Sequence, residues 1–198
     1  MGDTMAPTLP SEKSIQYADK IFDDHAADIG HIALQWNALH DALGEIFCGI
    51  IESNSGRMVV LAAWQSLASD RGKRQMLERA AFEKLGANDR LYQEIKWICG
   101  KLDSQEDKRN DAVHSPFGIS MEEGGFRVVP VLWTVHPRAQ KFKDKDIALE
   151  LKSYRKNLQS LTAFARRLIS FPALLAHGAS WPERPSLPRP AQATARKS

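Results

Sequence analysis

The feature that most constrains the fold is an apolar repeat that runs without a break through the first quarter of the chain. Apolar or semi-apolar residues recur there at spacings of three and four, at Ile15, Ala18, Phe22, His25, Ile29, Ile32, Trp36, Leu39, Leu43, Ile46 and Ile50. This spacing follows the turn of an α-helix. It predicts one long amphipathic helix, or two helices joined end to end with a kink at Gly30. Polar residues and a glycine at 53–56 predict its end.

Helical patterns resume further along the chain. Caps are expected at 69–70 and 88–89, with stops at Gly86 and Pro116. A short helical turn is expected from about Ser104 to His114. A last long helix carries one stripe formed by Ile147, Leu151, Tyr154, Leu158, Leu161, Phe164 and Leu168. The chain is therefore predicted to be all-α, a bundle of four to five helices, antiparallel because the connections are short.

One segment, at about 117–134, has a different period. Apolar residues alternate from Phe117 to Met121, a Glu-Glu-Gly-Gly turn follows, and the alternation returns from Phe126 to Leu132. This pattern predicts a β-hairpin inserted in the bundle, with Pro130 on an edge strand. The predicted single domain covers 11–177, and the termini at 1–10 and 178–198 are expected to be flexible.

Charge and composition exclude several classes of protein. The tail from 178 to 198 carries four cationic residues and one glutamate, which accounts for the whole net charge of +3. A neutral body argues against nonspecific coating of nucleic acid. No apolar run is long enough for a membrane span, and the N-terminus does not resemble a secretory signal, so a cytoplasmic protein is expected. Cys48 and Cys99 stand alone among apolar residues, which predicts buried reduced thiols and no zinc site.

The candidate for chemistry is the segment Arg109-Asn110-Asp111-Ala112-Val113-His114, which Ser115-Pro116 ends. Asn110 and His114 are one helical turn apart, whereas Arg109 lies ~140° from His114 around the helix axis. A histidine can move a proton to or from a ribose 2′-hydroxyl or a leaving 5′-oxygen. An arginine can hold the scissile phosphate, and Asn110 can orient either group. This chemistry needs no metal and no cofactor.

With this motif in a helical bundle, the chain resembles the HEPN domains (higher eukaryotes and prokaryotes nucleotide-binding). Their signature is an arginine, four to six residues and a histidine, often with a polar residue directly after the arginine, as in Arg109, Asn110 and His114. The resemblance implies a metal-independent endoribonuclease from a toxin–antitoxin or phage-defence system. It also implies a homodimer with a composite cleft, RNA as substrate, and an antitoxin or regulatory protein as partner. Pro116 stands where members paired with nucleotidyltransferase antitoxins often have a tyrosine.

Other residues are candidates for supporting roles. The basic loop offers Arg138, Lys141, Lys143 and Lys145 as contacts to RNA phosphates. His40 and Asp41 are candidates for lining the cleft, although the helix surface is an alternative place for them. His25 falls on the apolar stripe and is expected to pack in the core.

The motif also has alternative interpretations. Arg109 and His114 can instead be surface residues that serve only the helix end. The bundle can be a non-catalytic module that binds a nucleotide or a partner protein. A metal-binding bundle enzyme is the third alternative, with Asp28 and His31 or Asp111 and His114 as ligand pairs. Bundles of that class use Glu-x-x-His, which this chain lacks.

Overall fold

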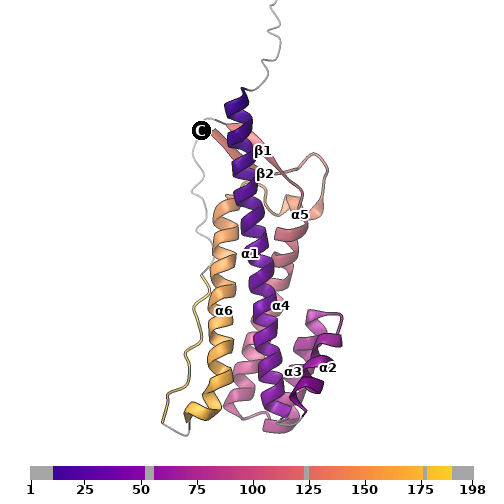
Figure 1. Ribbon diagram of the computed structural model, residues 1–198, viewed down its shortest axis with the longest axis vertical. Coiled ribbons are helices and arrows are strands. Elements are labelled where there is room, and N and C mark those ends of the chain that lie inside the picture. The colour runs from indigo at the N-terminus through magenta and orange to yellow at the C-terminus, as the bar shows by residue number, and fades with distance from the viewer. Residues whose placement is uncertain (1–10, 52–55, 123–124, 176–177, 189–198) are drawn as a thin grey trace, which may run out of the picture.

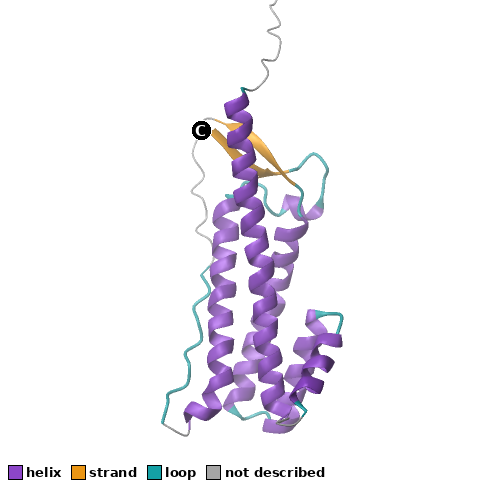
Figure 2. Cartoon of the chain, viewed as in Figure 1, coloured by secondary structure: helices purple, strands orange, loops and turns teal. Residues whose placement is uncertain are grey.

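The computed structural model describes residues 11–51, 56–122, 125–175 and 178–188. Its elements are α1 (Glu12–Ile51), α2 (Arg57–Ser66), α3 (Asp70–Leu85), α4 (Arg90–His114), β1 (Phe117–Glu122), β2 (Gly125–Pro130), α5 (Pro137–Gln140) and α6 (Ile147–Leu175). The predicted helical bundle with one inserted β-hairpin is confirmed (Figures 1 and 2).

The helix α1 is the spine of the bundle. Its 40 residues form one continuous helix through Gly30, so the first of the two alternatives is correct. It packs most extensively against α6, and next against α3. Its stripe from Ile32 to Ile50 supplies much of the core, and the α6 stripe from Leu151 to Leu168 packs opposite to it. None of the helices described has both the length and the apolar character that crossing a membrane requires.

The helix α4 is longer than predicted. It runs unbroken through the charged stretch that was expected to separate two helices. Asp89 caps its start by accepting from the backbone N–H groups of Leu91 and Tyr92. The buried side chains of Leu102 and Ala112 keep one face of the charged stretch in the core, so burial stabilises the helix there. The motif therefore lies on the last two turns of a long helix.

The hairpin covers the end of the bundle at which α4 stops. β1 and β2 pair antiparallel, with Phe117 opposite Pro130 and Ile119 opposite Val128. β2 packs on α1. Phe117 contacts both His25 of α1 and Phe142, which anchors the start of the hairpin to the bundle.

The expectation of a flexible tail from 178 onward is wrong for residues 178–188. This segment folds back beside α6 in an extended conformation (Figures 1 and 2). Trp181 packs on Phe171 with their ring centroids 4.0 Å apart, and Leu187 packs against the core. A segment of low hydrophobicity is expected to be disordered because it buries too little apolar surface by itself. Here α4 and α6 form a groove in which the few apolar side chains of the segment pack. The expectations for 1–10 and 189–198 lie outside the described residues.

Candidate functional site

The three motif residues lie close together at the end of α4 but differ in exposure. His114 is exposed, and no side-chain bond is recorded for it in the part of the chain that the structure describes. Arg109 is half-buried, and its Nη1 donates a hydrogen bond of 2.9 Å to Oδ1 of Asn110. Asn110 lies one turn before His114 on the same face. The helix thus presents an accessible imidazole beside an arginine–asparagine pair.

Arg109 and His114 point in different directions because they are ~140° apart around the axis of α4. Arg109 is directed to the core side of α4, where its charge acts on Tyr154 of α6. Its Nε atom is buried and finds no hydrogen-bond partner among the described residues. The guanidinium reaches Asn110 rather than His114, so the arginine is held by the amide and needs a rotation to meet a substrate beside the imidazole.

Asp111, in the middle of the motif, anchors two of the four predicted RNA contacts. Arg138 Nη1 donates to Asp111 Oδ1 at 2.9 Å, and Lys141 Nζ lies 2.8 Å from Oδ2. Only 9% of the Asp111 side chain is exposed. These ion pairs tie α5 and the turn after it to α4. Lys141 is exposed as well, so Lys143 and Lys145 differ from it only in that the described ranges provide neither of them with an ion pair.

A small cavity opens beside this cluster. It has a volume of about 120 Å³ and is lined in part by Lys108, Asp111, Lys141 and Lys145. Basic side chains therefore gather on the flank of the motif, between α4 and the segment that leads into α6. Glu150 also lines the cavity, so the cavity holds both signs of charge, with Lys141 already paired with Asp111.

The structure places His40 and Asp41 differently from the expected cleft lining. Asp41 is exposed, whereas His40 is buried between α1, α3 and α4, so the helix-surface alternative is also wrong for His40. The reason is Arg74 of α3, which the sequence analysis missed. Its side chain is 2% exposed, and its Nη1 contacts His40 Nε2 at 3.1 Å.

The hydrogen bonds of His40 define its protonation state. Its Nδ1 lies 3.0 Å from the carbonyl oxygen of Trp36 and therefore donates. Its Nε2 faces Arg74, which has only donors, so Nε2 accepts. The ring is neutral with its proton on Nδ1. Burial accordingly lowers the pKa of His40, and the charge of Arg74 acts in the same direction.

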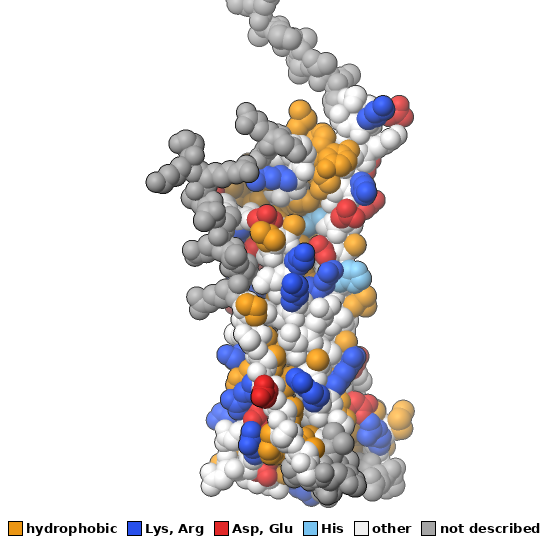
Figure 3. Space-filling view, turned by 90° about the vertical axis from the view of Figure 1, so that its left-hand side faces the viewer, with side chains coloured by type: hydrophobic (Ala, Val, Ile, Leu, Met, Phe, Trp, Pro, Cys, Tyr) orange, Lys and Arg blue, Asp and Glu red, His pale blue; other side chains and the backbone are white. Residues whose placement is uncertain are grey.

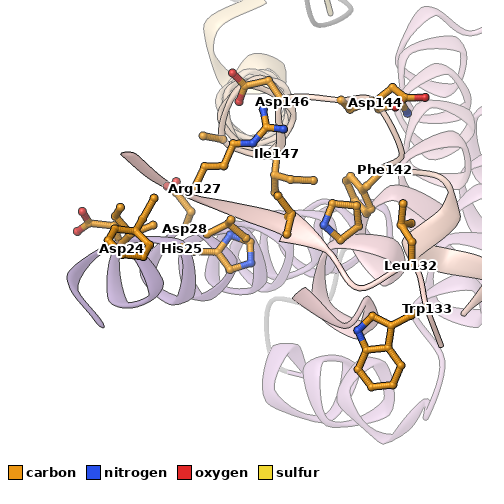
Figure 4. A pocket seen from close by; sticks show the side chains of 17 residues that line it. Asp24, His25, Asp28, Arg127, Leu132, Trp133, Phe142, Asp144, Asp146 and Ile147 are labelled. Carbon is orange, nitrogen blue, oxygen red and sulfur yellow. The ribbon is translucent and has the colours of Figure 1, made fainter. Parts of the chain in front are cut away.

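A larger cavity lies under the hairpin rather than at the motif. Its volume is about 1050 Å³, and α1, β2 and the segment before α6 line it (Figure 4). His25 contributes to its wall and packs edge-on against Phe117, with ring centroids 4.7 Å apart. The prediction of a packed histidine is confirmed there, since His25 is 8% exposed and burial lowers its pKa.

The described residues offer neither a cluster of metal ligands nor a reactive thiol. Among the residues that the structure describes, no three or more His, Cys, Asp or Glu side chains group as a metal site. Cys48 and Cys99 are buried and free, as predicted. Burial raises the pKa of the Cys99 thiol to about 12, so this thiol stays protonated and unreactive near neutral pH.

Comparisons of the chain with protein-family models, with curated proteins and with solved structures found no match.

Proposed function

We propose that the protein is a metal-independent endoribonuclease of HEPN type, with Arg109, Asn110 and His114 as its catalytic residues. The observation that carries the proposal is the end of α4. There an exposed imidazole, for which the described residues provide no side-chain partner, follows an arginine–asparagine pair by one helical turn. An accessible base or acid beside a phosphate-binding fork is what cleavage through the ribose 2′-hydroxyl needs.

In the proposed reaction, the 2′-oxygen attacks the adjacent phosphorus and the 5′-oxygen leaves. His114 takes the proton from the 2′-hydroxyl or gives one to the leaving 5′-oxygen. Arg109 holds the phosphate and offsets the charge that develops on it, and Asn110 positions the guanidinium. One imidazole cannot serve both proton transfers at once, so we propose that a second chain supplies the other motif in a homodimer.

Surface charge supports an anionic substrate. Lys143 and Lys145 are exposed near the motif, and Lys152 and Lys156 are exposed on the first turns of α6. Figure 3 shows the side of the molecule on which α6 lies, where Asp and Glu side chains are interspersed among Lys and Arg side chains. We propose that these lysines contact RNA phosphates outside the cleaved bond. A cytoplasmic location and regulation by an antitoxin-like protein belong to the same proposal.

The test is cleavage of end-labelled RNAs by the purified protein in the presence of EDTA. The wild type is expected to give 2′,3′-cyclic phosphate and 5′-hydroxyl ends. His114→Ala and Arg109→Ala are each expected to slow cleavage by about 10²- to 10⁴-fold. His31→Ala is the matched control, because His31 is an exposed histidine of α1 outside the motif. Equal rates for all variants, or cleavage that EDTA abolishes, would contradict the proposal.

A non-catalytic binding module is the second candidate, and the state of Arg109 favours it. The guanidinium is half-buried and already bonded to Asn110. In such a module Arg109 would only stabilise the end of α4, through its hydrogen bond to Asn110. RNA binding that survives His114→Ala, with no cleavage by the wild type, would support this candidate over the ribonuclease. Light scattering separates a monomer from the proposed homodimer in either case.

A further inference from the structure

The groove between α4 and α6 is occupied by the chain's own residues 178–188. After α6 the direction reverses at Gly178, whose φ of 77° favours glycine. The segment then returns beside α6, from Phe171 towards Asn157 (Figure 1). We call this segment the strap.

Two buried polar side chains of the groove bond to the strap. Glu94 of α4 is 5% exposed, and its Oε2 accepts a hydrogen bond of 2.6 Å from Nε of Arg184. Asn157 of α6 is 4% exposed, and its Nδ2 donates to the carbonyl oxygen of Pro188 at 3.3 Å. Besides Arg184, the described residues offer Glu94 only Arg90, at 3.9 Å. A carboxylate and an amide in these positions need a ligand, because buried polar groups without partners are costly.

Aromatic contacts provide the apolar part of the recognition. Trp181 packs on Phe171, and the Arg90 guanidinium lies 5.1 Å from the Trp181 ring centroid. The Arg184 guanidinium lies 5.3 Å from the ring centroid of Trp97 while it also bonds Glu94. Arginine between an aromatic face and a carboxylate is a specific mode of recognition that lysine does not reproduce.

The contacting residues of the strap follow a period of three. The side chains of Trp181, Arg184 and Leu187 contact the bundle, Arg184 with 44% of its side chain still exposed, whereas Glu183 and Ser186 are exposed and Pro182 and Pro185 are half-buried. Three prolines, at 182, 185 and 188, keep this stretch extended. A polyproline II helix has three residues per turn, so one of its faces presents every third side chain. Grooves lined with aromatic residues recognise such peptides because little conformational entropy is lost on binding.

We propose that the α4–α6 groove is a docking site for a proline-rich segment of a partner protein. That segment carries an aromatic residue, an arginine and an aliphatic residue at every third position. In the isolated chain the strap is an internal ligand that occupies the site. Because the strap is tethered, its effective concentration is about millimolar, and a partner competes with it. The proposal is independent of the proposed ribonuclease activity.

The test uses the full-length chain and a fluorescent peptide with the sequence of residues 179–190. Trp181→Ala combined with Arg184→Gln removes the strap's main contacts and leaves the groove open. Fluorescence anisotropy is expected to show the peptide binding to this open variant at least about tenfold more tightly than to the wild type. Glu183→Gln combined with Ser186→Ala is the matched control, because both residues are exposed members of the strap, and it is expected to bind like the wild type.

Two further measurements sharpen the outcome. A peptide with glutamine in place of its arginine, and the open variant that also carries Glu94→Gln, are each expected to lose most of the binding. Circular dichroism of every variant establishes that it is folded before its affinity is compared. An open variant that is folded but does not bind the peptide overturns the proposal. Wild-type dimers that the free peptide dissociates also overturn it, because they assign the groove to strap exchange between copies.

Discussion

Arg74 carries a full charge almost without contact with solvent, and three acceptors explain how. Its Nε and Nη2 donate to Asp103, Nη2 also donates to Glu106 at 2.6 Å, and Nη1 donates to His40. The two carboxylates are partly exposed, whereas the arginine is not. The arginine thus connects α1, α3 and α4 from within, and its removal affects the histidine more than the carboxylates.

Arg74→Met is expected to lower the free energy of unfolding by about 1–3 kcal/mol, because it leaves Nε2 of His40 buried without a donor. Urea denaturation measures this change. Arg71→Met, at an exposed position one turn earlier on the same helix, is the control, and its effect is expected within about 0.5 kcal/mol of zero. A similar effect for the two variants would show that the buried network does not stabilise the fold.

Stability is also expected to depend on pH through His40. Its folded-state pKa is lowered by burial from the ordinary value of 6.5. Well above pH 6.5 the His40 ring is neutral in the folded and the unfolded protein, so its titration does not affect stability. At lower pH the unfolded chain binds the proton more readily than the folded protein does, and proton binding therefore favours unfolding. The free energy of unfolding should therefore fall as the pH drops from 7 to 5.5. His40→Gln should make this dependence shallower without removing it, because burial also lowers the pKa of His25, as measured by denaturation at each pH.

Single residues also show where prediction from the sequence ends. Arg109, Asn110 and His114 could be proposed as a site from the sequence because their spacing along one helix is local information. Arg74 was missed because nothing near it in the sequence indicates that Asp103 and Glu106, on another helix, lie within reach. Long-range pairing of charges is set by the packing of helices, which the local pattern does not specify.

At the scale of elements, α1 and α2 approach each other closely at one glycine. A Cβ atom on Gly44 would lie 2.9 Å from Nε1 of Trp64, whose ring is fully buried. Gly49, five residues later on α1, has no atom of the described residues within 4 Å of its Cβ position. The two glycines therefore have opposite roles, although both lie inside the same helix.

Gly44→Ala is expected to destabilise the protein by about 1–3 kcal/mol through overpacking against Trp64. Gly49→Ala is expected to stabilise it by up to about 1 kcal/mol, since alanine is the better helix former and meets no neighbour. Thermal unfolding of the two variants provides the comparison. Stabilisation by both substitutions would mean that α2 moves away from α1 easily.

The elements themselves were largely predictable, and the differences have physical reasons. Apolar periods predicted α1, α6 and the hairpin, because α1 and α6 each bury one regular stripe and the paired strands alternate. The charged stretch 103–111 was expected to interrupt α4, yet Asp103 and Glu106 bond to Arg74, Asp111 bonds to the basic segment, and Leu102 and Ala112 on either side of the stretch stay in the core. The strap was missed because an extended segment has no helical or strand period.

At the scale of the molecule, the strap joins the ends of elements that are far apart in the sequence. Trp181 and Arg184 connect the start of α4 to the end of α6. Trp181→Ala is expected to lower the free energy of unfolding by about 1–2 kcal/mol, since the ring is half-buried. Denaturation of this variant beside Glu183→Gln measures the effect. No difference between the two would indicate that the strap does not contribute to stability.

The reversal at Gly178 also determines how the molecule would respond to a mechanical load. Because the strap runs back along α6, tension on the C-terminal end acts first at Pro188, where a single hydrogen bond joins it to Asn157. Leu187, Arg184 and Trp181 would then detach in that order, one contact at a time, before α6 bears any force. The strap thus detaches from the bundle progressively, starting at its C-terminal end, and the helices beneath it stay folded.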